Sequence, residues 1–223
     1  MAVLGVDGCP GGWVAAQVED GHVSWHVGDF AALMLVDAAV VGVDIPIGLP
    51  PDARRRAADV EARAALGRQR SSVFFAPPRV VLEAADQAHA TRLSRAIGST
   101  GVSIQLFHVL AKVAEVDAVL RADPAAAARV VEVHPEVSFR RLAGTDVLPS
   151  KRTAQGRHAR LAAVRSRWLP ALALPAPLPG RARADDCLDA LACAWTALRW
   201  SRGQAEVLGG EVDGEGLPMR IVV

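Results

Sequence analysis

The sequence predicts an α/β protein in which a mixed sheet is flanked by helices. Three observations lead to this fold class. Residues 1–28 contain three short apolar or alternating segments separated by turn residues. A continuous apolar run at 39–43 and a second valine-rich segment of buried-strand type at 129–134 follow later and are separated by a helical region. Strands joined through helices pair in parallel, whereas strands joined by tight turns pair antiparallel, so we expect both kinds of pairing in one sheet.

The first strands form a three-stranded antiparallel meander. The apolar run Val3–Val6 ends at Asp7 and is followed by the turn residues Gly8–Gly12. The alternating segment Trp13–Glu19 reads as the second strand, and Asp20-Gly21 is a dipeptide typical of hairpin turns. His22–Val27 is then the returning strand.

The next part of the chain is mainly helical. Phe30–Val36 predicts a short helix, and Ala39–Val43 predicts a strand buried on both faces. A helical insertion is expected over about 52–129, interrupted by the proline-containing segment Ser71–Arg79. That segment reads either as a loop beside the substrate or as a buried plug.

The C-terminal part supplies one more strand and two helices. Arg129–His134 predicts a buried strand, Pro149–Leu169 a basic helix, and Asp185–Trp200 the last strong helix. At 223 residues the chain is long enough for one sizeable core, so we expect a single domain, 1–223.

Composition excludes several classes of protein. Hydrophobic residues make up 51% and charged residues 22%, which excludes a disordered chain. No apolar run reaches the ~18 residues of a membrane span. The N-terminus lacks the features of a secretory signal, and three cysteines without metal-like spacing suit a reducing compartment. We therefore expect a cytoplasmic protein that does not contact a membrane.

Charge is distributed unevenly along the chain. Residues 1–50 carry six acidic groups and no lysine or arginine, which gives −6, whereas residues 137–183 carry ten basic groups and one acid, which gives +9. A segment at +9 is either the footprint of a polyanion or a solvated helix face. The arginines between 54 and 70 similarly belong either to a solvated helix face or to a ligand site.

Acidic residues on buried strands are the most informative feature. Asp7 and Asp44 each end an apolar strand, and Glu132 lies inside another. A buried carboxylate is costly unless it is paired, hydrogen-bonded or bound to a metal. Because no basic residue lies within 1–50, a divalent cation is the simplest partner, and an all-carboxylate set favours Mg²⁺ or Mn²⁺.

The last helix adds two acids to this set. Asp186 and Asp189 are three residues apart, so both lie on one helical face. Capping explains Asp185 and, in part, Asp186, because acids in the first turn favour the helix dipole. Asp189 is therefore the stronger candidate for function.

Several segments resemble one known family. Asp186–Ala192 is similar to the last-helix motif of the RuvC resolvase branch of the ribonuclease H-like superfamily. A closer resemblance is to a bacterial and archaeal family of predicted RNase H-like nucleases (domain of unknown function 429). It rests on Gly5–Trp13, Val43–Pro50, Glu132–Phe139 and Asp185–Ala190, with Lys151-Arg152-Thr153, Gly156 and Arg160 in addition.

The resemblance implies a ribonuclease H-like fold and a metal site that hydrolyses phosphodiester bonds. By this resemblance Asp7 would bridge two ions, and Asp44, Asp186 and Asp189 would complete the ligand set. Glu132 is an extra acid, and which subset binds metal stays open. In this mechanism two ions about 4 Å apart activate a water and stabilise the leaving oxygen.

Other residues are candidates for substrate contact. The basic cluster Lys151, Arg152, Arg157 and Arg160 suits phosphate, and the turn at Gly11 and Gly12 could cradle phosphate through its backbone. His134 reads as a structural histidine or as an accessory base or metal ligand, and Glu136 is a second accessory candidate.

These observations predict a Mg²⁺- or Mn²⁺-dependent nuclease with a two-metal carboxylate site, acting on nucleic acid of unspecified type. One alternative is a non-catalytic RNase H-like domain that binds nucleic acid or protein. Another is a hydrolase of a small phosphorylated metabolite. The oligomeric state stays open, with a homodimer as one option.

Overall fold

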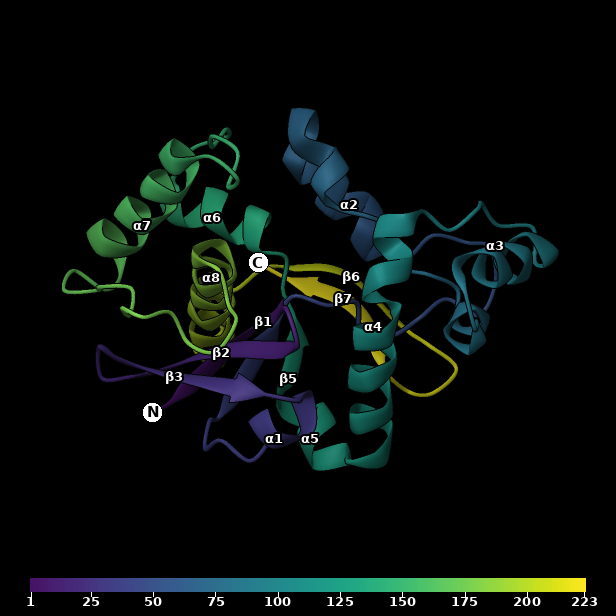
Figure 1. Ribbon diagram of the computed structural model, residues 1–223, viewed down its shortest axis with the longest axis horizontal. Helices are drawn as coiled ribbons and strands as arrows, with labels where there is room; N and C mark the ends of the chain where they lie inside the picture. The colour runs from purple at the N-terminus through teal and green to yellow at the C-terminus, as the bar shows by residue number, and fades with distance from the viewer. The chain divides into compact units, whose positions relative to one another are not determined.

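The computed structural model describes all residues 1–223 and divides the chain into two compact units (Figure 1). The first unit comprises 1–44, 129–206 and 222–223; the second comprises 45–128 and 207–221. The helical insertion expected at 52–129 thus makes up most of the second unit. None of the helices combines the length and apolar character needed to cross a membrane.

The first unit contains a five-stranded sheet in the order β3-β2-β1-β4-β5. Strands β1, β2 and β3 pair antiparallel, and β1, β4 and β5 pair parallel, which confirms the expected mixed sheet. The strands are β1 Val3–Cys9, β2 Gly12–Glu19, β3 His22–Gly28, β4 Val40–Val43 and β5 Val130–Glu132. Strand β1 runs past its expected end at Val6, because Asp7, Gly8 and Cys9 continue the hairpin ladder with β2.

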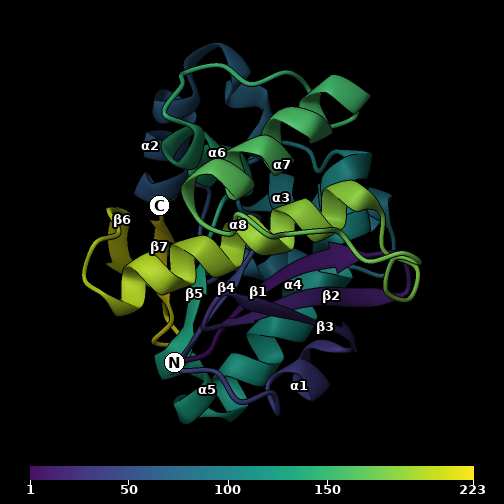
Figure 2. The same cartoon turned by 90° about the vertical axis from the view of Figure 1, so that its left-hand side faces the viewer.

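Helices cover both faces of this sheet. They are α1 Phe30–Leu33, α6 Pro135–Ala143, α7 Ala154–Arg167 and α8 Ala184–Ser201. Helix α8 lies across β1, β2 and β4, with α6 and α7 packed beside it (Figure 2). Helix α1 covers the opposite face, where the ring of Phe30 lies 5.6 Å from that of Trp13.

Helix boundaries follow local capping. The basic helix expected at 149–169 begins only at Ala154, because the Thr153 side chain accepts a hydrogen bond from the Gly156 backbone and caps it. Helix α6 was not expected from the sequence. It begins at Pro135, a residue that suits the first turn of a helix, although the same proline reads from sequence as the end of a strand.

The second unit is helical with one small sheet. Its elements are α2 Ala57–Leu66, η1 Gly67–Ser72, η2 Arg79–Glu83, α3 Gln87–Ala96, α4 Ile104–Ala122, α5 Pro124–Arg129, β6 Val207–Val212 and β7 Pro218–Val222. The last residues of α5 and β7 belong to the first unit. The hairpin β6-β7 was not expected, because its exposed first strand carries little apolar signal.

Segment 71–79 of the second unit lies partly in the interior and partly at the surface. Val73, Ala76, Pro77 and Pro78 are buried, and the Ala76 backbone donates to Asp59. Arg56 is also buried, where it pairs with Asp59 and donates to the backbone carbonyls of Ile47 and Gly48. Ser71, Ser72 and Phe74 are exposed, so the buried plug describes only part of the segment.

Candidate metal centre

Three carboxylates of the first unit converge at one end of its sheet. One oxygen each from Asp7, Asp44 and Asp189 lie within 4.8 Å of one another. Asp7 is on β1, Asp44 directly follows β4, and Asp189 is on α8. Asp7 and Asp189 are buried and Asp44 is half-buried. Residues far apart in sequence thus form a group that could hold a metal ion.

The sheet register places Asp7 beside Asp44. In the parallel pair β1-β4, Gly5 is opposite Gly42 and Val6 is opposite Val43. Because side chains alternate between the faces of a strand, each aspartate shares a face with the glycine two positions before it. Both carboxylates therefore point to the face that α8 covers.

Two glycines let α8 approach that face closely. A Cβ at Gly5 would lie 2.0 Å from the Ala190 carbonyl oxygen, and one at Gly42 would lie 2.5 Å from that of Cys193. Only a residue without a side chain fits under the helix backbone at either place. The close approach brings Asp189 down to the two strand carboxylates.

Sequence reasoning missed the role of these glycines. The signal was present as a repeat, because Gly5-Val6-Asp7 and Gly42-Val43-Asp44 share the pattern Gly-Val-Asp. In each copy the glycine accommodates the helix and the aspartate faces the site.

A lysine also reaches this cluster. The ammonium of Lys151 donates a hydrogen bond to Asp189 Oδ2. Lys151 was expected to contact phosphate, and the structure places it among the acids instead. One ammonium against three ionised carboxylates leaves a formal charge of −2, which one divalent ion would balance.

The segment before α7 holds Lys151 in place. Thr153 donates to the Ser150 carbonyl, and Arg157 donates to the Arg152 carbonyl at 2.9 Å. A Cβ at Gly156 would lie 1.9 Å from the Ser150 carbonyl oxygen, so the turn packs directly on α7. Most of the motif at 151–160 therefore builds the turn that presents Lys151.

Arg160 has an internal role. Its guanidinium is buried, donates to the Pro149 carbonyl and pairs with Glu136 at 2.6 Å. Arg160 therefore does not face solvent, where a substrate phosphate would be. Arg152 is exposed and Arg157 half-buried, so these two keep access to solvent.

Burial disfavours ionisation of the three carboxylates. It raises the pKa of Asp44 to about 6 and that of Asp189 to about 7, although Lys151 lowers both. Burial, and then the charges of Asp189 and Asp44, raise the pKa of Asp7 well above its usual value. Burial lowers the pKa of Lys151, but the three acids outweigh it and raise that pKa overall, so the lysine stays charged.

One carboxylate oxygen of the cluster has no partner in the protein. Asp189 is 1% exposed, and its Oδ1 accepts no hydrogen bond. A buried oxygen without a partner carries a desolvation cost that a bound cation would remove. With the three converging carboxylates, this oxygen shows that the residues present fit a metal ion with a preference for oxygen ligands.

Two of the expected acids lie outside this group of three. Glu132 is opposite Val43 in the β4-β5 pair, so it points to the other face from Asp44. Asp186 accepts a hydrogen bond from the Arg183 backbone at 2.8 Å and so caps α8. Its charge still contributes to the raised pKa of Asp7.

Of the two accessory candidates, Glu136 acts electrostatically on the cluster. Glu136 is half-buried and raises the pKa values of Asp44 and Asp189, although it also pairs with Arg160. His134 is half-buried at the N-cap of α6. Gly12 pairs with Cys9 in the hairpin ladder, so Pro10-Gly11 is a two-residue turn. Gly11 has positive φ, which a turn with proline at its first central position requires of the second, and Gly12 is the first residue of β2.

The cysteines are not suited to bind metal. Cys9, Cys187 and Cys193 are buried and form no disulfide. Burial raises the pKa of Cys187 to about 12 and also raises that of Cys193. Metal ligation requires the thiolate, so these two residues serve as packing residues.

Comparison with known proteins gave one match. A family model described as a protein of unknown function, DUF429, matches residues 5–214. No curated protein and no solved structure matches the chain. The matched region contains the three converging aspartates and Lys151. Because the match covers nearly the whole sequence, the chain belongs to the DUF429 family.

Proposed function

We propose that this protein is a metal-dependent nuclease of the ribonuclease H-like class, which hydrolyses phosphodiester bonds in nucleic acid. The observation that carries the proposal is the convergence of Asp7, Asp44 and Asp189 with an unpartnered buried oxygen on Asp189. The ribonuclease H-like assignment is supported by the mixed sheet of order β3-β2-β1-β4-β5 with α8 across it, because the fold that the resemblance implies has such a sheet flanked by helices.

The roles of the residues follow from their positions. Asp7, Asp44 and Asp189 would hold Mg²⁺ or Mn²⁺, and Asp186 and Glu136 are the nearby acids that could complete a two-ion set. When bound, such ions polarise the phosphoryl group and lower the pKa of a water molecule. Lys151 would then be available to contact a phosphate oxygen, because the cation would take its place beside Asp189.

The proposal is tested by cleavage assays with matched variants. The substrates are single- and double-stranded RNA and DNA, an RNA–DNA hybrid and a DNA junction, each with Mg²⁺ or Mn²⁺. We expect cleavage of at least one substrate by the wild type and a loss of at least 100-fold in Asp7→Asn, because a ligand carboxylate is removed. Asp20→Asn is the control, since Asp20 is an exposed turn residue at positive φ that asparagine tolerates.

A second candidate function rests on the lysine. Because Lys151 already pairs with Asp189, the cluster could be a structural ion pair in a non-catalytic domain that binds nucleic acid or protein. Titration calorimetry with Mn²⁺ separates the two candidates. Uptake of Mn²⁺ by the wild type but not by Asp7→Asn supports the nuclease, whereas no uptake at millimolar Mn²⁺, together with no cleavage, removes it.

A further inference from the structure

A pocket in the second unit is lined by three arginines from one stretch of the chain, 55–70. The pocket has a volume of about 670 Å³, within the range of small-molecule sites. Its wall includes Arg55, which precedes α2, Arg63 within α2, Arg70 within η1 and Phe75 in the following loop. No acidic residue lines it.

An aromatic ring organises two of these arginines. The guanidinium carbon of Arg55 lies 3.9 Å from the centre of the Phe75 ring, and that of Arg63 lies 4.7 Å from it. Arg63 also donates to the Val73 carbonyl. Stacking on a ring and hydrogen bonding to the backbone restrict otherwise flexible side chains, so the guanidinium groups are held in place before a ligand arrives.

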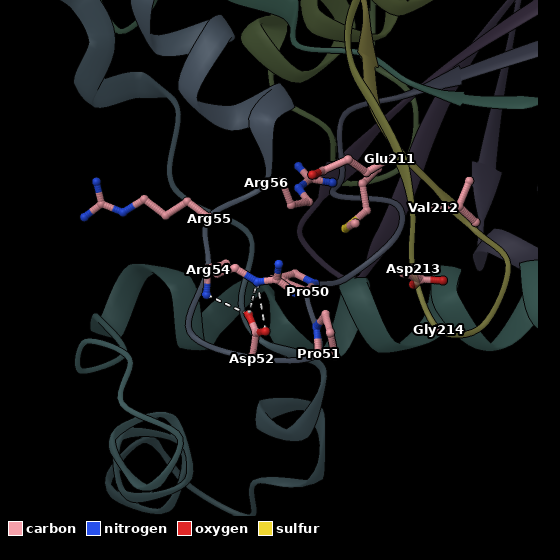
Figure 3. Close-up of a pocket in the computed structure, with 11 residues that line it drawn as sticks. Pro50, Pro51, Asp52, Arg54, Arg55, Arg56, Glu211, Val212, Asp213 and Gly214 are labelled. Carbon is pink, nitrogen blue, oxygen red and sulfur yellow. Dashed lines mark hydrogen bonds and ion pairs between the residues drawn. The ribbon is translucent and has the colours of Figure 1, made fainter.

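The arginines of this pocket have no acidic partner. Four other arginines of the unit do have one: Arg54 pairs with Asp52, Arg56 with Asp59, Arg79 with Asp117 and Asp213, and Arg121 with Asp117 and Glu215. Arg55, Arg63 and Arg70 take part in no ion pair. In the neighbouring pocket, the Arg55 side chain extends away from Asp52, Glu211 and Asp213 (Figure 3).

We propose that this pocket binds the phosphate group of a nucleotide or of a nucleic-acid strand. Guanidinium groups present paired N–H donors that match phosphate oxygens, and the three arginines bring this chemistry to one concave surface. The pocket shares no residue with the carboxylate cluster and needs no metal, so it does not depend on the nuclease proposal.

The test measures binding in EDTA, which excludes metal. The probes are a fluorescent single-stranded DNA, a fluorescent single-stranded RNA and a fluorescent nucleoside triphosphate, followed by anisotropy at about 0.1 M salt. The main variant is Arg55→Gln with Arg70→Gln, because both side chains are exposed and neither makes a hydrogen bond. We expect at least about tenfold weaker binding of one or more probes, since charge-assisted hydrogen bonds are lost.

A strand bound here has a further signature. The slope of log affinity against log salt should fall in magnitude by about 1.4 in the double variant, or about 0.7 for each lost contact to a single strand. Phe75→Leu keeps every charge but removes the ring that holds Arg55 and Arg63, so a smaller loss of affinity is expected.

The matched control is Arg92→Gln with Arg95→Gln, two exposed arginines of α3. Weaker binding of the strands alone or of the nucleotide alone identifies the source of the phosphate, and either result supports the site. An equal loss in the control shows attraction by net charge only and overturns the proposal. Failure of the wild type to bind any probe overturns it as well.

Discussion

Asp7 shows how a single residue can be unfavourable for stability and useful for binding. Its carboxylate is buried beside two further acids, and burial with these charges raises its pKa. The folded protein therefore holds a group that would be more easily ionised in water. Such sites are typical of functional carboxylates, which a bound cation stabilises.

Asp7→Asn should stabilise the metal-free protein while abolishing its response to metal. At pH 8 we expect its free energy of unfolding to rise by about 1 kcal/mol or more, because one pKa unit corresponds to about 1.4 kcal/mol. Thermal unfolding with and without Mn²⁺ measures both effects. A wild-type Tm that Mn²⁺ leaves unchanged, or a variant less stable than wild type, would contradict the prediction.

Removing the charge of Lys151 should destabilise the metal-free protein, which is the opposite of the effect expected for Asp7→Asn. In Lys151→Met the three carboxylates lose their only cation, so we expect a loss of about 1–3 kcal/mol without metal. This is below the range for fully buried pairs, because the lysine side chain is 36% exposed. The stabilisation by Mn²⁺ should grow, which isothermal titration and thermal unfolding would detect. An unchanged response to Mn²⁺ would mean that lysine and metal do not share the site.

At the scale of elements, the contact of α8 with β1 and β4 builds the site. Gly5 and Gly42 allow the helix backbone to touch the sheet, and Asp189 reaches the strand acids only because of this close packing. The two glycines thus affect function by setting the distance between α8 and the sheet, and they contribute no functional group themselves.

Gly5→Ala should displace α8. The added Cβ would lie 2.0 Å from the Ala190 carbonyl, so we expect a loss of about 3 kcal/mol, at the upper end for overpacked cores, together with weaker Mn²⁺ binding. Gly214→Ala is the control, because no atom lies within 4 Å of its added Cβ and its φ is not positive. Denaturant unfolding compares them, and similar stability of the two variants would refute the packing argument.

At the scale of the whole molecule, the two units should respond oppositely to pH. In the first unit, burial raises the pKa values of Asp44 and Asp189 to about 6 and about 7. In the second, burial alone would raise the pKa of Asp213, but hydrogen bonds from the Leu49, Leu217 and Glu215 backbones and from Arg79 lower it overall.

The sign of each effect follows from proton linkage. The first unit binds more protons folded than unfolded between about pH 4 and pH 7, so its stability falls as pH rises through this range. The second unit owes stability to ionised Asp213. That stability is complete above the usual carboxyl pKa and is lost as pH falls through the lowered one.

Amide hydrogen exchange at several pH values, corrected for intrinsic rates, tests this contrast. Without metal, α8 amides should be better protected at pH 5 than at pH 8, whereas the Leu49 and Leu217 amides should lose protection only in more acidic solution. Mn²⁺ should restore protection of α8 at pH 8, because metal competes with protons for the carboxylates. Parallel changes in both units would contradict the assignment of these groups.

Much of the architecture could be predicted from sequence because it depends on local patterns. The meander, the two parallel strands and the last helix follow from apolar periodicity and turn residues, and Asp7, Asp44 and Asp189 stand out as acids next to apolar runs. The hairpin β6-β7 and helix α6 lacked such a pattern.

The sequence by itself determined the five strands of the first sheet, the last helix, the family resemblance and the acids that could form a site. Only the tertiary structure decided which acids meet. The sheet register places Glu132 on the other face, and Asp186 caps α8. Lys151 pairs with Asp189, and Arg160 pairs with Glu136. The tertiary structure also gathered Arg55, Arg63 and Arg70 into one pocket. The physical reason is that pairing and burial depend on distance in space, which local sequence patterns do not encode.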